Sequence, residues 1–206
     1  MSKVKICGLT RPEDIDAVNR VLPDYVGFVF APSRRRIDEK MAAALKARLN
    51  SRIQAVGVFV NGDADIVEHL YRGGVIDLAQ LHGDEDEAYI ARLKDRCGCP
   101  VIKAGGVGKT LPPLPENADY WLFDTLSVRR GGTGRAFDWG LLKGFNGPPY
   151  FLAGGLTAQN AAEAVRTLSP YCADVSSGAE TDGVKDAEKI EAFVRLVRGE
   201  KKDGSR

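Results

Sequence analysis

The sequence predicts an α/β protein that forms a single (β/α)8 barrel. Short apolar segments, mostly rich in β-branched residues, alternate with segments of helical periodicity along nearly the whole chain. Eight apolar segments of this kind occur, and nearly all are followed by a helical pattern. Strands separated by helices are parallel and joined by right-handed crossovers, and eight such units close a barrel. A doubly wound open sheet is the structural alternative.

The first half of the chain supplies four strand and helix units. Asp14 and Asp16 stand near the start of the first helical pattern, where negative charge suits the helix dipole. The expected strands are 3–7, 25–30, 53–60 and 76–82, and the expected helices are 12–22, 38–49, 63–74 and 84–97.

The second half is less regular. Residues 105–118 contain three prolines and several turn formers, so the crossover after the fifth strand should have a short or degenerate helix. The domain is expected to span 1–206, with 199–206 as a frayed polar tail. The expected strands are 100–104, 119–124, 149–154 and 172–177, and the expected helices are 138–145, 157–168 and 184–197.

Composition narrows the class of protein. The 29 Lys and Arg residues and 28 Asp and Glu residues leave a net charge of +1, so no global field favours nucleic acid or an anionic membrane. No apolar run approaches the length of a bilayer span and the first ten residues lack the apolar segment of a signal peptide, which indicates a cytoplasmic protein. Cys97 and Cys99 have no neighbouring ligand cluster, so no metal site is expected.

Residues at the carboxyl ends of the strands are the candidates for function, because the active sites of such barrels lie there. Cys7 ends the first strand and is either inert filler or a reactive thiol facing a pocket. His82 ends the fourth strand, whereas His69 lies within a predicted helix and is expected on the surface or in packing. Cys172 begins the last strand at the opposite end, so it is interpreted as core.

The last two strand ends carry the strongest phosphate signal. Gly154 and Gly155 stand between a strand and a helix that Thr157 should cap, and Ser177 and Gly178 follow the eighth strand. Glycines let backbone amides approach phosphate oxygens closely, although they could merely form tight turns. Two other glycine-rich segments are weaker: "KAGGVGKT" lacks a following helix and is interpreted as a surface loop, and "GGTGRAF" as a flexible active-site loop.

Charged residues at two other strand ends are also candidates for function. Arg34, Arg35 and Arg36 could be a solvated run, but at least one is placed to bind a carboxylate through two hydrogen bonds. Asp124 ends an aromatic strand, where partial desolvation would raise its pKa and let it act as an acid. A cap or a loop brace is the alternative for Asp124.

These motifs, taken together, resemble those of the phosphoribosylanthranilate isomerase family over nearly the whole chain. The segments that carry the resemblance are, in order, "KICGLT", "VGFVFAPSRRRI", "VGVFVN", "LAQLHGDE", "VIKA", "FDT" with "GGTGRAFDW", "LAGGLTAQN", and "DVSSGAE" with "GVKD". The family often has an aromatic residue where Ile37 stands, and a proline is often found before Gly183, so the match departs at these points.

The resemblance implies a cofactor-independent Amadori rearrangement of N-(5'-phosphoribosyl)anthranilate in tryptophan biosynthesis. It implies Cys7 as general base, Asp124 as general acid and Arg36 as the partner of the anthranilate carboxylate. His82 is a further substrate-binding candidate, and the phosphate would lie on Gly154, Gly155, Ser177 and Gly178. The expected partner is a small phosphorylated substrate, and the expected assembly is a monomer, with a homodimer as the alternative.

Two other functions stay open on the residues alone. Another barrel enzyme acting on a phosphorylated sugar would share the phosphate signal, although related chemistries call for lysine and glutamate or for two aspartates at the strand ends. A non-catalytic protein that binds a phosphorylated ligand would leave Cys7 and Asp124 without a chemical role.

Overall fold

The computed structural model describes residues 1–126 and 137–200, and its centre is a closed barrel of eight parallel strands. Each strand pairs with the next in sequence, and β1 (Lys3–Cys7) closes the ring by pairing with β8 (Cys172–Val175). The predicted (β/α)8 fold is therefore confirmed. The other strands are β2 (Tyr25–Val29), β3 (Gln54–Phe59), β4 (Leu78–Leu81), β5 (Val101–Val107), β6 (Tyr120–Thr125) and β7 (Tyr150–Leu152).

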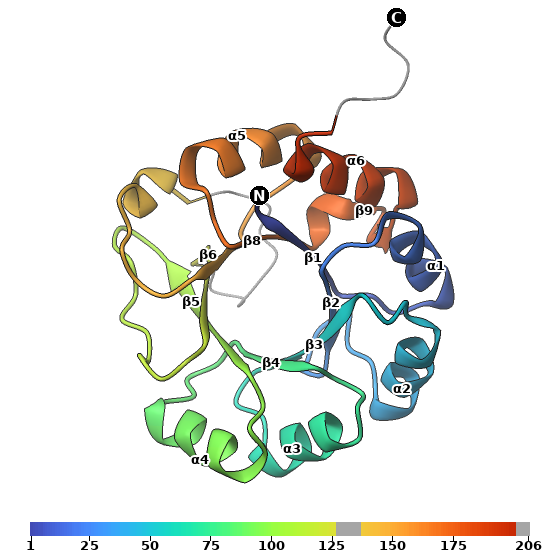
Figure 1. Ribbon diagram of the computed structural model, residues 1–206, viewed down its shortest axis with the longest axis vertical. Helices are drawn as coiled ribbons and strands as arrows, with labels where there is room; N and C mark the ends of the chain where they lie inside the picture. The colour runs from blue at the N-terminus through green and yellow to red at the C-terminus, as the bar shows by residue number, and fades with distance from the viewer. Residues whose placement is uncertain (127–136, 201–206) are drawn as a thin grey trace, which may run out of the picture.

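Helices surround the barrel on its outside (Figure 1). Aspartates fix where several of them begin: Asp38 accepts a hydrogen bond from Met41 N at 2.8 Å, and Asp86 accepts one from Tyr89 N at 2.8 Å. No helix among the described residues is long and apolar enough to cross a membrane. The helices are α1 (Pro12–Val21), α2 (Glu39–Arg48), α3 (Ala64–Arg72), α4 (Glu87–Cys97), α5 (Ala158–Leu168) and α6 (Ala187–Arg198).

The connections after β5 and after β6 lack a regular α-helix among the described residues. Residues 105–118 are fully described and contain no helix, as their prolines predict, and the strand before them continues to Val107. The helix expected at 138–145 is a single 3-10 turn, η1 (Trp139–Leu142), after Asp138 caps Gly140 N at 2.8 Å.

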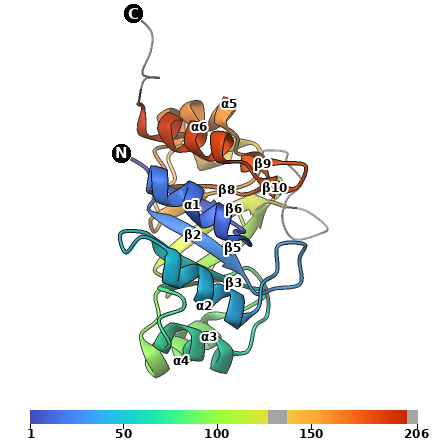
Figure 2. The same ribbon diagram turned by 90° about the vertical axis from the view of Figure 1, so that its right-hand side faces the viewer.

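The closing helix was predicted to begin too early, at residue 184. Val184 instead belongs to β10 (Val184–Lys185), which pairs antiparallel with β9 (Glu180–Thr181). Asp182 and Gly183 have φ of 51° and 81°, so the chain turns back on itself there and α6 starts only after Asp186 caps it. This hairpin follows the 3-10 turn η2 (Ser177–Ala179), and the side view places it at the end of the barrel away from the N-terminus (Figure 2).

Three aspartates hold the opposite end of the barrel, which we call the floor. Each stands just before an even-numbered strand, and its carboxylate accepts a hydrogen bond from a backbone N–H of the preceding strand. Asp24 binds Val4 N at 2.9 Å, Asp77 binds Ala55 N at 2.6 Å and Asp119 binds Val101 N at 2.8 Å. These bonds join β1 to β2, β3 to β4 and β5 to β6 at the end farthest from the strand carboxyl termini.

Candidate active site

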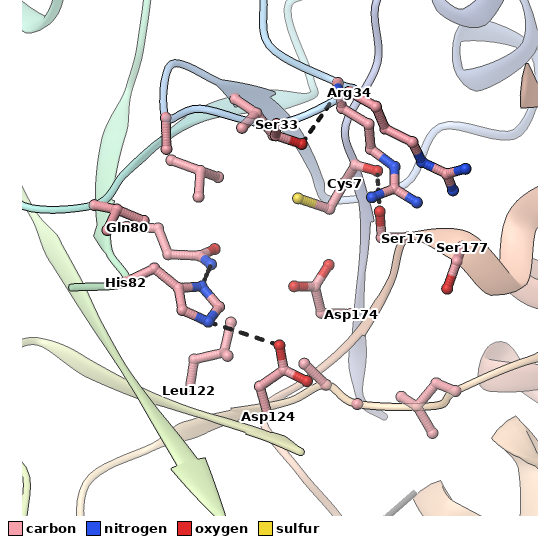
Figure 3. Close-up of a pocket in the computed structure, with 18 of the residues that line it drawn as sticks. Cys7, Ser33, Arg34, Gln80, His82, Leu122, Asp124, Asp174, Ser176 and Ser177 are labelled. Carbon is pink, nitrogen blue, oxygen red and sulfur yellow. Dashed lines mark hydrogen bonds and ion pairs between the residues drawn. The ribbon is translucent and has the colours of Figure 1, made fainter. Parts of the chain in front are cut away.

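A cavity of about 580 Å³ opens at the carboxyl ends of the strands. Parallel strands all end at the same face, so residues far apart in sequence meet in its wall. Neither Arg36 nor Gly178 belongs to that wall. The predicted site residues that line it are Cys7, His82, Asp124, Gly154, Gly155 and Ser177 (Figure 3).

Cys7 is the last residue of β1, and its side chain is buried in the cavity wall. Burial raises the pKa of the Cys7 thiol above its usual value, and the positive charges of Lys5 and Lys185 oppose that rise by favouring the thiolate. General-base catalysis by Cys7 requires the thiolate form. The cations are present, but in the protein without ligand the desolvation penalty outweighs them.

Asp124 lies near the end of β6, with 14% of its side chain exposed. Its Oδ1 accepts a hydrogen bond from Thr125 N at 2.7 Å. Burial raises the pKa of Asp124 to about 6, although the Thr125 N–H lowers it in part. The carboxyl group can therefore carry a proton close to neutral pH, which is what a general acid requires.

His82 lies between Gln80 and Asp124 (Figure 3). Gln80 Nε2 lies 3.0 Å from His82 Nδ1, and His82 Nε2 lies 3.6 Å from Asp124 Oδ2. With Nδ1 accepting from the Gln80 amide, the ring proton is on Nε2, which faces the Asp124 carboxylate. His82 and Asp124 also border a second cavity of about 460 Å³, so the two side chains form part of the wall between the cavities.

The two glycines after β7 adopt backbone angles that favour glycine. Gly154 and Gly155 have φ of 78° and 71°, and a Cβ at Gly154 would lie only 2.5 Å from Thr125 N. The helix α5 begins immediately after Thr157, so its N-terminal end lies beside this turn. Gly178 is packed too closely for any side chain, because a Cβ there would lie 2.1 Å from Leu156 O. Gly178 thus joins the loops after β7 and β8, and Ser177 contributes to the cavity wall.

The arginine run divides between cavity and solvent. Arg34 and Arg35 line the cavity, whereas Arg36 is exposed and its backbone forms a bridge to Val29. Ile37, next in the chain, is buried in the core. Only 15% of the Arg35 side chain is exposed, against 59% for Arg34. The geometry therefore favours Arg35 over Arg36 for contact with a ligand in this cavity.

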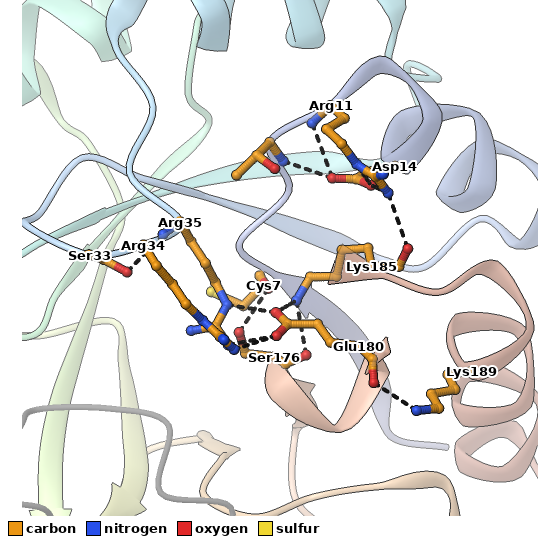
Figure 4. A network of polar contacts seen from close by, with 11 residues as sticks. Cys7, Arg11, Asp14, Ser33, Arg34, Arg35, Ser176, Glu180, Lys185 and Lys189 are labelled. Carbon is orange, nitrogen blue, oxygen red and sulfur yellow. Dashed lines mark hydrogen bonds and ion pairs between the residues drawn. The ribbon is translucent and has the colours of Figure 1, made fainter. Parts of the chain in front are cut away.

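One carboxylate organises this side of the site (Figure 4). Glu180 in β9 accepts hydrogen bonds from Arg34 Nη2 at 2.6 Å, from Arg35 Nε and Nη2 at 2.6 and 2.9 Å, and from Lys185 Nζ at 2.7 Å. Lys185 also donates to the Ser176 carbonyl oxygen at 2.9 Å. The loop after β2 and the hairpin after β8 are thereby held together beside Cys7.

Sequence reasoning did not single out several polar residues of the site. They are Lys5, Gln80, Asp174, Glu180 and Lys185. All five are buried, and three of them lie within strands of the barrel, where polar residues stand among apolar ones. The one available signal is the alternation along a strand: Lys5 is two residues before Cys7, so both side chains point to the same face.

The remaining predictions also have positions in the structure. In "KAGGVGKT", residues 103–107 continue β5 and Lys103 is buried against Glu85, so most of the segment is strand and not surface loop. In "GGTGRAF", residues 131–136 lie outside the described residues. His69 is exposed and contacts Glu39, and Cys172 is fully buried, as expected. The four cysteines are free thiols, although Cys97 and Cys99 are separated by only one residue.

A protein-family model described as N-(5'-phosphoribosyl)anthranilate (PRA) isomerase matches residues 4–196. The chain belongs to the PRA isomerase family. A PRA isomerase from Endomicrobium trichonymphae is 52% identical over 199 residues, which cover 96% of this chain and 99% of the relative. The family resemblance inferred from the motifs is thus confirmed.

Solved structures of PRA isomerases share the fold. The crystal structure of the enzyme from Thermotoga maritima is 32% identical, with a TM-score of 0.84, and the match covers 97% of this chain and 100% of that one. A second PRA isomerase structure, in complex with reduced 1-(o-carboxyphenylamino)-1-deoxyribulose 5-phosphate, is 31% identical with a TM-score of 0.81, over 97% and 100% of the two chains.

Proposed function

We propose that this chain catalyses the Amadori rearrangement of N-(5'-phosphoribosyl)anthranilate to 1-(2-carboxyphenylamino)-1-deoxyribulose 5-phosphate, without a cofactor. The observation that carries the proposal is the placement of Cys7 and Asp124 on opposite sides of one cavity (Figure 3). An aldose to ketose rearrangement needs an acid at the ring oxygen and a base at C2, and these two groups supply one each. Membership of the PRA isomerase family supports this substrate.

The first step is the opening of the furanose ring, with Asp124 as the acid. Asp124 gives its proton to the ring oxygen while the bond from that oxygen to C1 breaks, and the anthranilate nitrogen forms a Schiff base with C1. A pKa of about 6 keeps part of the Asp124 population protonated near neutral pH while leaving the proton easy to transfer.

In the second step, Cys7 acts as the base. Its thiolate takes the proton from C2 and leaves a neutral enolamine. The enolamine becomes the ketone when C1 gains a proton, which balances the one that Cys7 gives up, and the C2 hydroxyl loses its proton, which restores the acid form of Asp124. The reaction is an isomerisation, so acid and base return to their starting states. A positioned acid or base contributes roughly 10²- to 10⁴-fold to the rate, or about 3 to 5 kcal/mol for each group.

The two ends of the substrate bind at different parts of the cavity wall. The phosphate is proposed to accept hydrogen bonds near Gly154, Gly155 and Ser177, with the N-terminal end of α5 supplying partial positive charge. Gly178 serves this site by keeping the two loops close. For the anthranilate carboxylate we propose Arg35, because Arg35 lines the cavity and Arg36 does not.

The test is a fluorescence assay. Phosphoribosylanthranilate is generated in situ, and the loss of its anthranilate-type emission is followed with the wild type, with Cys7→Ser and with Cys97→Ser. Cys97 is half-buried and lies outside the cavity, so Cys97→Ser is the matched control.

Decay with the wild type and the control, but not with Cys7→Ser, is the expected result. No decay with the folded wild type would favour a protein that binds a phosphorylated ligand without turnover.

We further propose a cytoplasmic monomer. Light scattering checks the monomer, since a mass near twice 22.3 kDa would establish the homodimer instead.

A further inference from the structure

A buried ion pair lies directly behind the proposed base. Lys5 and Cys7 are two residues apart in β1, so their side chains share the inner face of the barrel. Lys5 has no exposed surface, and its Nζ lies 2.8 Å from Asp174 Oδ2. Lys5 and Asp174 are also register partners in the pairing of β1 with β8. The ion pair is therefore built into the sheet and does not depend on a loop.

Asp174 is only half satisfied by this ion pair. Its side chain is buried in the wall of the same cavity as Cys7 (Figure 3). Within the part of the chain that the structure describes, its second oxygen, Oδ1, is buried and has no hydrogen-bond partner. A buried carboxylate with an unpaired oxygen is costly, which indicates a function beyond structural pairing.

The other charged groups around Cys7 have strong partners elsewhere. Lys185 in β10 and Arg35 in the loop after β2 are both bound to Glu180. Asp124 approaches from β6 on the far side of the cavity. Lys5 is therefore the nearby cation whose partner, Asp174, retains an unpaired oxygen beside the thiol.

We propose that Lys5 and Asp174 are positioning residues that set the proton affinity of Cys7, with Lys5 stabilising the thiolate and Asp174 limiting that stabilisation. The proposal rests on the proposed role of Cys7 as base. In a buried site of low effective dielectric, a cation held on the same strand face attracts the thiolate strongly, and an adjacent carboxylate repels it. The opposing effects of these two charges on the pKa of Cys7 agree with this arrangement.

If Lys5 and Asp174 set the proton affinity of Cys7, removing their charges should shift the pKa of Cys7 in opposite directions, which a purely structural ion pair would not do. Removing either member of a structural pair should loosen the fold in the same way. Removing the charge of Asp174 should instead lower the pKa of Cys7, and removing the charge of Lys5 should raise it. Each shift should be about one pH unit or more, as for charges within a few ångströms of a titrating group.

The experiment measures the rate at which iodoacetamide alkylates Cys7 between pH 6 and 11. Alkylation is read by mass spectrometry of the peptide that carries Cys7, so the other three cysteines do not interfere. The proteins are the wild type, Asp174→Asn, and the double variant Lys5→Met with Asp174→Asn. Lys5→Met alone would leave the buried Asp174 carboxylate without its cation and destabilise the fold. The double variant avoids this, and its comparison with Asp174→Asn gives the effect of Lys5 alone.

The matched control is Glu85→Gln. Glu85 forms a similarly buried pair with Lys103, with 2% and 5% of the side chains exposed, but neither residue lines the cavity of Cys7. Loss of the Glu85 charge should lower stability and leave unchanged the pH midpoint of Cys7 alkylation. Circular dichroism verifies that each variant is folded, and Lys5→Arg, which keeps the charge, should retain a midpoint close to that of the wild type.

A lower midpoint in Asp174→Asn and a higher one in the double variant than in Asp174→Asn would support the proposal. Midpoints that do not move, or that move in the same direction, would overturn it. Alkylation requires no turnover, so this experiment is independent of the fluorescence assay. Absence of turnover in that assay would contradict the isomerase proposal, whereas unshifted alkylation midpoints would contradict the positioning proposal.

Discussion

The Arg35 guanidinium makes two hydrogen bonds to the Glu180 carboxylate, of 2.6 and 2.9 Å, and 4% of the Glu180 side chain is exposed. The two residues are 145 positions apart and come from the loops after β2 and β8. The contact fixes the side chain of Arg35, a residue of the cavity wall, before any ligand arrives. Since ordering a long side chain costs conformational entropy, a group that is already held binds its ligand at lower cost.

Glu180→Gln should weaken substrate binding more than it slows the chemical step. The amide leaves the cations Arg35 and Lys185 poorly compensated, so we expect KM to rise roughly tenfold and stability to fall by about 3 kcal/mol. Steady-state kinetics and urea unfolding measure the two effects. Glu188→Gln, at an exposed glutamate of α6, is the control and should change neither. An unchanged KM in Glu180→Gln would show that Arg35 needs no such support.

Arg35→Lys and Arg36→Lys should differ clearly. Lysine keeps the charge but loses the planar guanidinium, whose Nε and Nη2 are held by Glu180 at position 35. KM should therefore rise roughly 10- to 100-fold when the residue that binds the substrate carboxylate is changed. We expect this effect for Arg35→Lys and a change below about twofold for Arg36→Lys, because only Arg35 lines the cavity. The reverse order would restore the role that the sequence resemblance implied for Arg36.

Asp124→Asn should gain stability while it loses activity. The folded pKa of about 6 lies above the usual 3.8, so the buried carboxylate destabilises the protein above pH 6 and this penalty disappears below about pH 4. Urea unfolding should therefore show Asp124→Asn to be more stable than the wild type by on the order of 2 kcal/mol at pH 8, with no gain near pH 4. A gain of equal size at both pH values would mean that ionisation is not its cause.

The pH profile of kcat/KM should be bell-shaped. Its rise should have a midpoint near pH 6, from Asp124, and its fall should lie above the usual pKa of a thiol, because burial raises the pKa of Cys7. The reactive form has Asp124 protonated and Cys7 ionised. It is the minor species, because between the two pKa values most molecules have Asp124 ionised and the Cys7 thiol protonated. The residual activity of Asp124→Asn should lack the rise near pH 6 and increase up to the pKa of Cys7. A wild-type rise that persists in this variant would assign it to another group.

Asp77→Ala should weaken the fold and spare the chemistry. It removes the acceptor for Ala55 N and the partner of Lys46, at the end of the barrel opposite the cavity. We expect a loss of about 1 to 3 kcal/mol in urea unfolding, with kcat within about twofold of the wild type. Asp65→Ala, which removes an exposed ion pair with Arg96, should have a much smaller effect on stability than Asp77→Ala, because solvent screens exposed pairs. A large loss of kcat in folded Asp77→Ala would connect the floor to the site.

The fold was predictable because its signals are local. Apolar runs and turn residues place the eight strands, and the prolines within 105–118 predict the missing helix. The start of α6 was not predictable from periodicity, since Val184 fits the helical pattern equally well and only the turn at Asp182 and Gly183 separates it from the helix.

The site was predictable only where it follows from strand ends. Cys7 and Asp124 both come at such ends, so the barrel brings them together. Lys5 and Asp174 meet across 169 residues, and one sequence gives no sign of that contact. The choice between Arg35 and Arg36 depends on which side of an irregular loop faces inward, and periodicity does not decide this in a run of three identical residues.

The three floor aspartates divide the barrel into modules. Each bond lies within one pair of strands: β1 with β2, β3 with β4, and β5 with β6. A circular permutant opened just before β3, β5 or β7 would keep every bonded pair on one continuous stretch of chain. An opening just before β2, β4 or β6 would split a pair between the two new ends. Two-strand units, and not single strands with their helices, are therefore the natural pieces for recombining this barrel.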